Sequence, residues 1–221
     1  TGIYHLSSNN AGTKDIFLVK LNSVGNLVWA KSIGGSGNDA GTALVATNTG
    51  EVYSCGYFFG VADFNPDSST FILPSDGSYD VYITKFDAAG NFNWANRYGG
   101  PSLDVPRTLS VNTSGAVYCA GQYYQHFDVS NDTSRTLISK GGIDAFVLSS
   151  SSSGNLMWAK SIGGTNHDYA NSLVTDRSNN TFIVGNYLST SLYLDTTELT
   201  GGVANQSDIY FAKLGCSTSS N

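Results

Sequence analysis

The chain repeats one long motif at an almost constant spacing, and this feature constrains the fold more than any other. Three segments align without gaps, and a fourth copy starts at Asp208 and stops short: Asp15–Gly35, Asp80–Gly100 and Asp144–Gly164. The tryptophans within them follow each other at 65 and then 64 residues: Trp29, Trp94 and Trp158. A period of this length is typical of a tandem-repeat protein, in which each repeat buries its core against its neighbours.

Within one period the residues form the pattern of two β-hairpins. Val81–Phe86 alternates as a strand does, Asp87–Asn91 supplies turn residues, and Phe92–Ala95 makes the partner strand. A second hairpin joins Arg107–Val111 to Ala116–Gly121. Each period therefore predicts about four strands, and the long connection between the hairpins adds a short edge-like segment.

Four antiparallel strands in each repeat are the unit of a β-propeller blade. No segment keeps a 3.6-residue period, which excludes helical repeats. We therefore predict an all-β fold: a β-propeller-like array of four-stranded antiparallel blades, with about three and a half repeats of 64–65 residues in one segment, 1–221. The expected repeats are approximately 1–39, 40–104, 105–168 and 169–216, followed by a polar tail at 217–221.

About three and a half repeats do not close a ring of four to eight blades. Either further repeats flank this segment, or a second copy completes the ring as a homodimer. The start at Thr1 rather than Met favours flanking repeats, because it resembles a cut.

The composition argues against two classes of partner. The net charge is −6, from 11 basic and 17 acidic residues without a charged run, which leaves little to neutralise a phosphate backbone. No apolar stretch reaches the roughly 18 residues that span a bilayer. Nucleic-acid binding and membrane insertion are therefore not expected.

The repeated motif resembles the bacterial β-propeller repeat often abbreviated SBBP. The resemblance rests on D-[AIV]-[FY], then G-N-x-x-W-A and G-G-x-x-x-D, and then G-x-V-Y-x-x-G with D-F-N-P-D after it. It covers nearly the whole chain. The resemblance implies a secreted or cell-surface bacterial protein, in which the propeller is an interaction or architectural module without a shared enzymatic activity.

The residues that recur at each period are better explained by packing than by catalysis. Asp39, Asp104 and Asp168 each follow a Gly-Gly turn, where a carboxylate can accept backbone N–H groups. The histidines do not recur at one repeat position, and no Ser-His-Asp order or metal-ligand spacing is evident. We therefore predict no enzyme. A propeller glycosidase or lyase that uses these aspartates as paired carboxylates is the third hypothesis.

The long connection carries oxygen ligands at alternate positions in two successive repeats, as D-x-[NS]-x-D. Hard cations such as Ca²⁺ prefer oxygen ligands of this kind. Candidate calcium ligands are Asp63, Asn65, Asp67, Asp128, Ser130 and Asp132. Asx-turn chemistry explains the same residues without a metal, so no cofactor is required and Ca²⁺ is the one that the pattern allows.

Each inner hairpin places an aromatic residue two positions after a glycine. The candidate ligand-binding residues are Phe58, Tyr123 and Tyr187, with Tyr124 adjacent to the second. Aromatic faces beside amide side chains suit sugar rings or peptides, but core packing at the blade edge explains these residues better.

Taken together, these patterns predict a non-enzymatic extracellular binding or structural module that makes protein–protein or surface-assembly contacts. The alternative is a carbohydrate-binding propeller that uses the aromatic rim. Expected partners are other surface or secreted proteins and, in the alternative, glycans.

The cysteines follow no ligand spacing. The alignment of repeats places Cys55 and Cys119 on opposite faces of their sheets, because side chains alternate along a strand. We therefore expect two small core residues rather than a disulfide between them.

Overall fold

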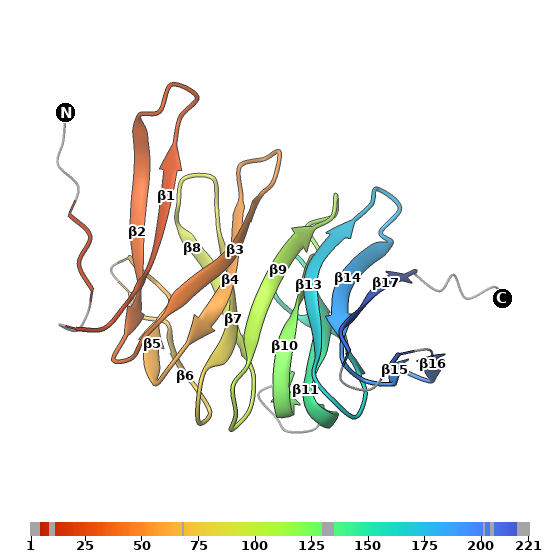
Figure 1. Ribbon diagram of the computed structural model, residues 1–221. Coiled ribbons are helices and arrows are strands. Elements are labelled where there is room, and N and C mark those ends of the chain that lie inside the picture. The colour runs from red at the N-terminus through yellow and green to blue at the C-terminus, as the bar shows by residue number, and fades with distance from the viewer. Residues whose placement is uncertain are drawn as a thin grey trace.

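The computed structural model describes residues 5–8, 12–67, 69–129, 135–200, 202–203 and 206–215. Within these ranges the chain has no α-helix and forms seventeen strands in four antiparallel sheets. Figure 1 shows the sheets side by side as a row, with β1 at one end and β17 at the other. The predicted all-β array of antiparallel blades is confirmed. In the part of the chain that is described, no helix is long and apolar enough to cross a membrane.

We call the four sheets blades 1 to 4. Blade 1 contains β1 (Ile16–Leu21), β2 (Leu27–Gly35), β5 (Val61–Asp63) and β6 (Ile72–Pro74). Blade 2 contains β3 (Ala40–Ala46), β4 (Val52–Phe58), β7 (Asp80–Phe86) and β8 (Phe92–Tyr98). Blade 3 contains β9 (Val105–Val111), β10 (Val117–Asp128), β11 (Thr136–Ser150), β12 (Leu156–Gly163), β15 (Ser191–Leu194) and β16 (Thr197–Thr200). Blade 4 contains β13 (Asp168–Thr175), β14 (Thr181–Tyr187) and β17 (Asp208–Leu214).

The long connection in each repeat forms an arm that crosses to the preceding blade. The β5–β6 hairpin follows β4 of blade 2, yet β5 pairs with β2 of blade 1 through Gly34↔Asp63 and Gly35↔Ala62. The β15–β16 hairpin pairs with β12 of blade 3 in the same way, and the outer ends of β10 and β11 reach Gly99 through Asp128. The arm accounts for a period that is long for a four-stranded blade, because its strands belong to the neighbour.

Apolar side chains fill the space between successive blades, so no blade has a core of its own. Ile16, Leu18 and Trp29 of blade 1 pack against Tyr82 and Phe86 of blade 2. Blades 2 and 3 share a second buried cluster, and blades 3 and 4 share a third. This is the arrangement expected when a sheet has two apolar faces that it must cover with neighbours.

The recurring Gly-Asn-x-x-Trp motif holds neighbouring blades together. Gly90 and Gly154 occupy turns with φ of +87° and +88°, and a Cβ on either would lie 2.9 Å from the indole of Trp29 or Trp94 in the preceding blade. The indole Nε1–H of Trp94 also donates to the carbonyl of Ser152 in the next turn (3.1 Å). Glycine is therefore required twice here, for the positive φ and for the close approach of the ring.

Cys55 and Cys119 are buried free cysteines, and they belong to the same cluster between blades 2 and 3. They lie on opposite faces of their own sheets, as expected. Because those two faces are the ones that pack together, the thiols contact each other, and burial raises the pKa of the Cys119 thiol. The third cysteine, Cys216, lies outside the described residues.

Candidate binding surface at the lower end of blades 2 and 3

Asp39, Asp104 and Asp168 are buried, and each carboxylate ties the start of one blade to the preceding Gly-Gly turn. Oδ2 of each accepts the N–H of the second glycine, at 3.0, 2.8 and 2.7 Å. Oδ1 of Asp39 also accepts the Phe59 N–H (3.2 Å), and Oδ1 of Asp168 accepts the Leu188 N–H (3.2 Å). These contacts are those of a scaffold, and they leave the carboxylates without solvent access.

A second buried aspartate lies beside Asp104. A Cβ on Gly99 would be 2.7 Å from Oδ1 of Asp80 and 2.9 Å from Oδ2 of Asp104, so both carboxylates lie against the same glycine. Burial raises the pKa of Asp104 to about 9, and the Asp80 charge adds to this rise. Burial also raises the pKa of Asp80 to about 6, opposed by the Asp76 N–H and by Arg97 (2.8 Å). Asp104 is therefore protonated at neutral pH, which removes one charge from the pair.

Two aspartates at equivalent positions of other blades shift in the same direction. Burial raises the pKa of Asp39 to about 6 and that of Asp144 to about 7. Burial is the largest cause of the rise in both carboxyl groups.

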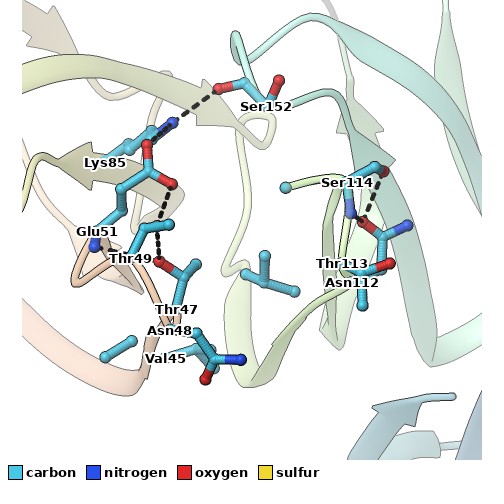
Figure 2. A pocket seen from close by; sticks show the side chains of 13 residues that line it. Val45, Thr47, Asn48, Thr49, Glu51, Lys85, Asn112, Thr113, Ser114 and Ser152 are labelled. Atoms are coloured by element: carbon cyan, nitrogen blue, oxygen red, sulfur yellow. Dashed lines mark hydrogen bonds and ion pairs between the residues drawn. The ribbon is translucent and has the colours of Figure 1, made fainter. Parts of the chain in front are cut away.

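A polar cavity of about 540 Å³ lies between the turns of blades 2 and 3, at the upper end in Figure 1. Figure 2 shows that Lys85 is held there by Glu51 (Nζ–Oε1 2.8 Å) and by the carbonyl of Ser152 (3.4 Å). Burial opposes the charge of Lys85, but the Glu51 carboxylate raises its pKa above the usual value. Thr49 donates to the other oxygen of Glu51 (3.3 Å). The charged groups of this cavity are thus paired with each other.

The candidate calcium loop is closed by its own hydrogen bonds. Oδ1 of Asp63 accepts the N–H groups of Asn65 (3.0 Å) and Phe71 (2.8 Å), and Oδ1 of Asn65 accepts the Asp67 N–H (3.1 Å). Oδ1 of Asp67 pairs with Lys31 at 2.6 Å, and this contact lowers the Asp67 pKa.

In the second candidate loop, the Thr136 hydroxyl donates to Asp128, while Ser130 and Asp132 lie outside the described residues. No group of three or more His, Cys, Asp or Glu side chains in the described ranges could hold a metal. Calcium binding stays a prediction.

The aromatic rim expected from the sequence is mostly core. Phe58 and Tyr123 are fully buried, in the clusters between blades 1 and 2 and between blades 2 and 3. Tyr187 is half-buried and packs near Tyr210, with ring centroids 6.5 Å apart. Of the four, only Tyr124 is exposed. The structure does not leave the rings of Phe58 and Tyr123 free for a ligand, because residues two apart on a strand share a face and this face packs on the preceding blade.

The neighbouring positions form an open groove instead. A cavity of about 580 Å³ lies between blades 2 and 3 at the lower end, and its lining residues are Thr42, Tyr57, Tyr79, Leu103, Val105, Arg107 and Gln122. The rings of Tyr57 and Tyr79 meet edge to face at 5.1 Å, and the exposed Phe59 lies 5.7 Å from Tyr79. Arg107 is held by Gln122, whose Oε1 accepts from both Nε (3.3 Å) and an Nη (3.0 Å).

The groove is built from positions that differ between repeats. The residue after the repeated glycine is Tyr57 in blade 2, Gln122 in blade 3 and Asn186 in blade 4, although the glycine before it does not change. Thr42 and Arg107 occupy the equivalent irregular position of β3 and β9, and they differ in the same way. Sequence reasoning missed these residues because it followed what recurs. Variation at equivalent positions was the available signal.

Comparison with known proteins found no matching family model. The chain is 26% identical over 199 residues to the regulatory protein FlaEY of Caulobacter vibrioides, which covers 88% of this chain and 20% of that protein. It is 25% identical over 231 residues to the uncharacterized WD repeat-containing protein L264 of Acanthamoeba polyphaga mimivirus, covering 91% of this chain and 17% of that protein.

The chain therefore spans about a fifth of the length of these relatives or less. The likenesses agree with a repeated, propeller-like architecture and, in general terms, with a protein-interaction module. They do not extend to the SBBP family, and that resemblance stays a prediction.

Proposed function

We propose that the chain is a non-enzymatic binding module that makes protein–protein or surface-assembly contacts through the groove between blades 2 and 3. The proposal places it in a secreted or surface-attached bacterial protein, as the repeat resemblance implies. The observation that carries the proposal is the aromatic cluster beside Arg107, in which Phe59 is exposed and Tyr57 and Tyr79 are half-buried. Aromatic side chains and arginine are enriched at the energetic centres of protein interfaces.

The recurring positions and the variable positions of the repeat have different roles, and this difference supports the proposal. The repeated aspartates, glycines and tryptophans are occupied by contacts within and between blades. The residues at the groove make few such contacts and differ from blade to blade. A rigid scaffold with variable residues at one end is the usual design of a recognition surface.

The direct test compares the wild type with a groove variant, Tyr57→Ser/Tyr79→Ser/Arg107→Ala. All three residues are at least partly exposed, so the variant should keep the melting temperature of the wild type. We expect the immobilised wild type to retain one secreted or envelope protein of the source organism at 1:1 stoichiometry, and the variant to lose this complex at least 10-fold. Thr113→Ala, at the opposite end, is the matched control. Equal retention by both proteins would refute the groove as the site.

A carbohydrate ligand is the second candidate, because Tyr57 and Tyr79 lie beside the hydroxyl of Thr42 and the amide of Gln122. Flat aromatic faces with amide and hydroxyl donors suit sugar rings. Saturable binding on a glycan array, lost in the same groove variant, would favour this candidate over a protein partner. Light scattering would show whether the 23.4 kDa chain forms the homodimer considered above. Localisation is tested separately, by protease accessibility on intact cells.

A further inference from the structure

Arg107 carries a positive charge that no carboxylate of the described chain neutralises. The chain has 17 acidic against 11 basic residues. The ion pairs within the described ranges use other cations, namely Lys31, Lys85, Arg97 and Lys160. Arg107 is exposed in the groove between blades 2 and 3, where the neutral side chain of Gln122 holds it. An arginine without an acidic neighbour in so acidic a chain requires an explanation.

The contact with Gln122 leaves one edge of the guanidinium open. Oε1 of Gln122 accepts from Nε (3.3 Å) and from one Nη (3.0 Å), which together form one edge of the planar group. A guanidinium has five N–H donors, so the edge between its two Nη atoms keeps its N–H groups for another acceptor. Two parallel N–H groups on such an edge match the two oxygens of a carboxylate.

The equivalent positions of the other blades show that the fold does not require this charge. Thr42, Arg107 and Asn171 occupy the same irregular position of β3, β9 and β13. In blade 4, Nδ2 of Asn171 donates to Oδ1 of Asn186 at 2.8 Å. A neutral amide thus makes the cross-strand contact that Arg107 makes in blade 3. The charge of Arg107 is therefore an addition to the scaffold.

Apolar and aromatic side chains lie beside Arg107 in the groove. Tyr57 and Tyr79 meet edge to face there, and Leu103 is 41% exposed among the same lining residues. Side chains of this kind are suited to bury an aliphatic or aromatic group of a ligand. The groove thus combines an apolar surface with a cationic edge.

The polar groups of the groove favour a carboxylate over a sugar. Oε1 of Gln122 is taken up by Arg107, and the Thr42 hydroxyl donates to the carbonyl of Cys55 (3.4 Å). A sugar hydroxyl both donates and accepts, whereas an ionised carboxylate only accepts. The free N–H groups of Arg107 therefore fit a carboxylate better.

We propose that the groove binds an acidic peptide segment of a partner protein. The carboxylate of an Asp or Glu in this segment pairs with the open edge of Arg107, and a neighbouring apolar side chain packs on Tyr57 and Tyr79. The inference rests on the proposed role of the groove in protein–protein contacts, and it names the chemistry that the groove recognises in the partner.

The test begins with a phage-display library of short random peptides, selected on the immobilised wild type. Each peptide is fused to the coat protein at its C-terminus, so Asp and Glu side chains supply all its carboxylates. We expect the enriched sequences to share an acidic residue next to an apolar one. A synthetic copy with both ends blocked should bind in calorimetry, and the matched peptide with the acid changed to its amide should bind at least 10-fold more weakly.

Two protein variants locate the contact. Arg107→Gln should weaken binding of the acidic peptide at least 10-fold and should remove the difference between the acidic and amide peptides. Arg177→Gln, in the exposed turn between β13 and β14, removes the same charge elsewhere and should leave both affinities unchanged.

Enriched peptides without a shared acid would overturn the inference, as would an acid–amide difference that survives in Arg107→Gln. A selection that yields no peptide dependent on Arg107 would overturn it as well. The partner captured from the source organism separates this inference from the proposed function. If Arg107→Gln keeps that partner and the triple groove variant loses it, the inference fails and the proposed function stands. If both variants keep it, the proposed function fails too.

Discussion

The interface between blades 2 and 3 and the open side of β1 present the same repeat positions to opposite surroundings. Phe146 is fully buried over Gly121, whereas Phe17 at the equivalent position is exposed. Leu109 is buried and Leu44 is exposed for the same reason. The residues are chemically similar in each pair, so the neighbouring strands alone decide whether a side chain is core or surface. A blade in this protein therefore contributes one face to each of two interfaces and is not a separate folded unit.

The largest contrast is expected between Phe146→Ala and Phe17→Ala. The first removes a ring from a closed interface and should lower the free energy of unfolding by about 3–5 kcal/mol. The second removes an exposed ring and should change it by less than about 0.5 kcal/mol. Urea unfolding followed by tryptophan fluorescence measures both. Similar losses for the two variants would mean that the open side of β1 is covered in solution.

The second contrast is between Asp104 and Asp39, which occupy equivalent positions at the two interfaces. A raised pKa means that the folded state holds a proton which the unfolded state has released, so the stability contributed by the proton is present at low pH and is lost as pH rises towards the folded pKa. With a pKa of about 9, Asp104 should reduce stability by up to about 4 kcal/mol between pH 5 and 8. With a pKa of about 6, Asp39 should reduce stability by about 1 kcal/mol over the same pH range, most of it below pH 6.

Unfolding measured from pH 5 to 8 in the two asparagine variants separates these contributions. Asp104→Asn keeps an oxygen for the Gly100 N–H and resembles the protonated acid. It should flatten the pH dependence through pH 8, whereas Asp39→Asn should alter it only at the acidic end. A wild type whose stability does not fall above pH 6 would contradict the assignment for Asp104.

A smaller effect is expected from the turn glycines. Gly90→Ala and Gly25→Ala both place a side chain at positive φ, +87° and +83°. Only the first also meets an indole, because nothing lies within 4 Å of a Cβ on Gly25. The two variants should differ in their free energy of unfolding by about 1–2 kcal/mol, and this difference isolates the contact between Trp29 and the next blade. Equal losses would show that the indole moves aside without cost.

The smallest effect concerns the ion pair that joins β2 to the arm of blade 2. Lys31 and Asp67 are partly exposed, so Lys31→Ala should cost only a few tenths of a kcal/mol at low salt and less at high salt. The same variant frees the Asp67 carboxylate. Calorimetry with millimolar Ca²⁺ on the wild type and on Lys31→Ala then tests whether the Lys31 ammonium occupies the position at Asp67 that a Ca²⁺ ion would take.

The strands and turns of this fold could be predicted from the sequence because they depend on local patterns that repeat. Alternation marks Val81–Phe86, and the turn residues after it are recognisable one by one. The pairing of β5 with the preceding blade could not be predicted, since it joins segments through a short register that no local residue specifies. In the sequence, the strands of the arms could be recognised only as a short edge-like segment in the long connection.

The site shows how a shift of one position changes the outcome. The sequence analysis chose Phe58, two residues after the glycine, and the structure places the open surface at Tyr57 and Phe59. Residues one apart on a strand face opposite sides. Which side is open depends on the neighbouring blade, and composition does not show this. The contact between the two buried cysteines could not be predicted for the same reason, because it depends on which faces of neighbouring blades pack together.

The arms also set an order on folding during synthesis. β2 ends at Gly35, but its partner β5 begins at Val61, in the inner hairpin's connection of the following repeat. On the ribosome, a blade thus waits for roughly half of the next repeat to emerge before its outer strand is paired. Each repeat is completed by the one that follows it, so the nascent chain carries an outer strand whose partner has not yet been synthesised. Chaperones or mispairing would act first at that strand.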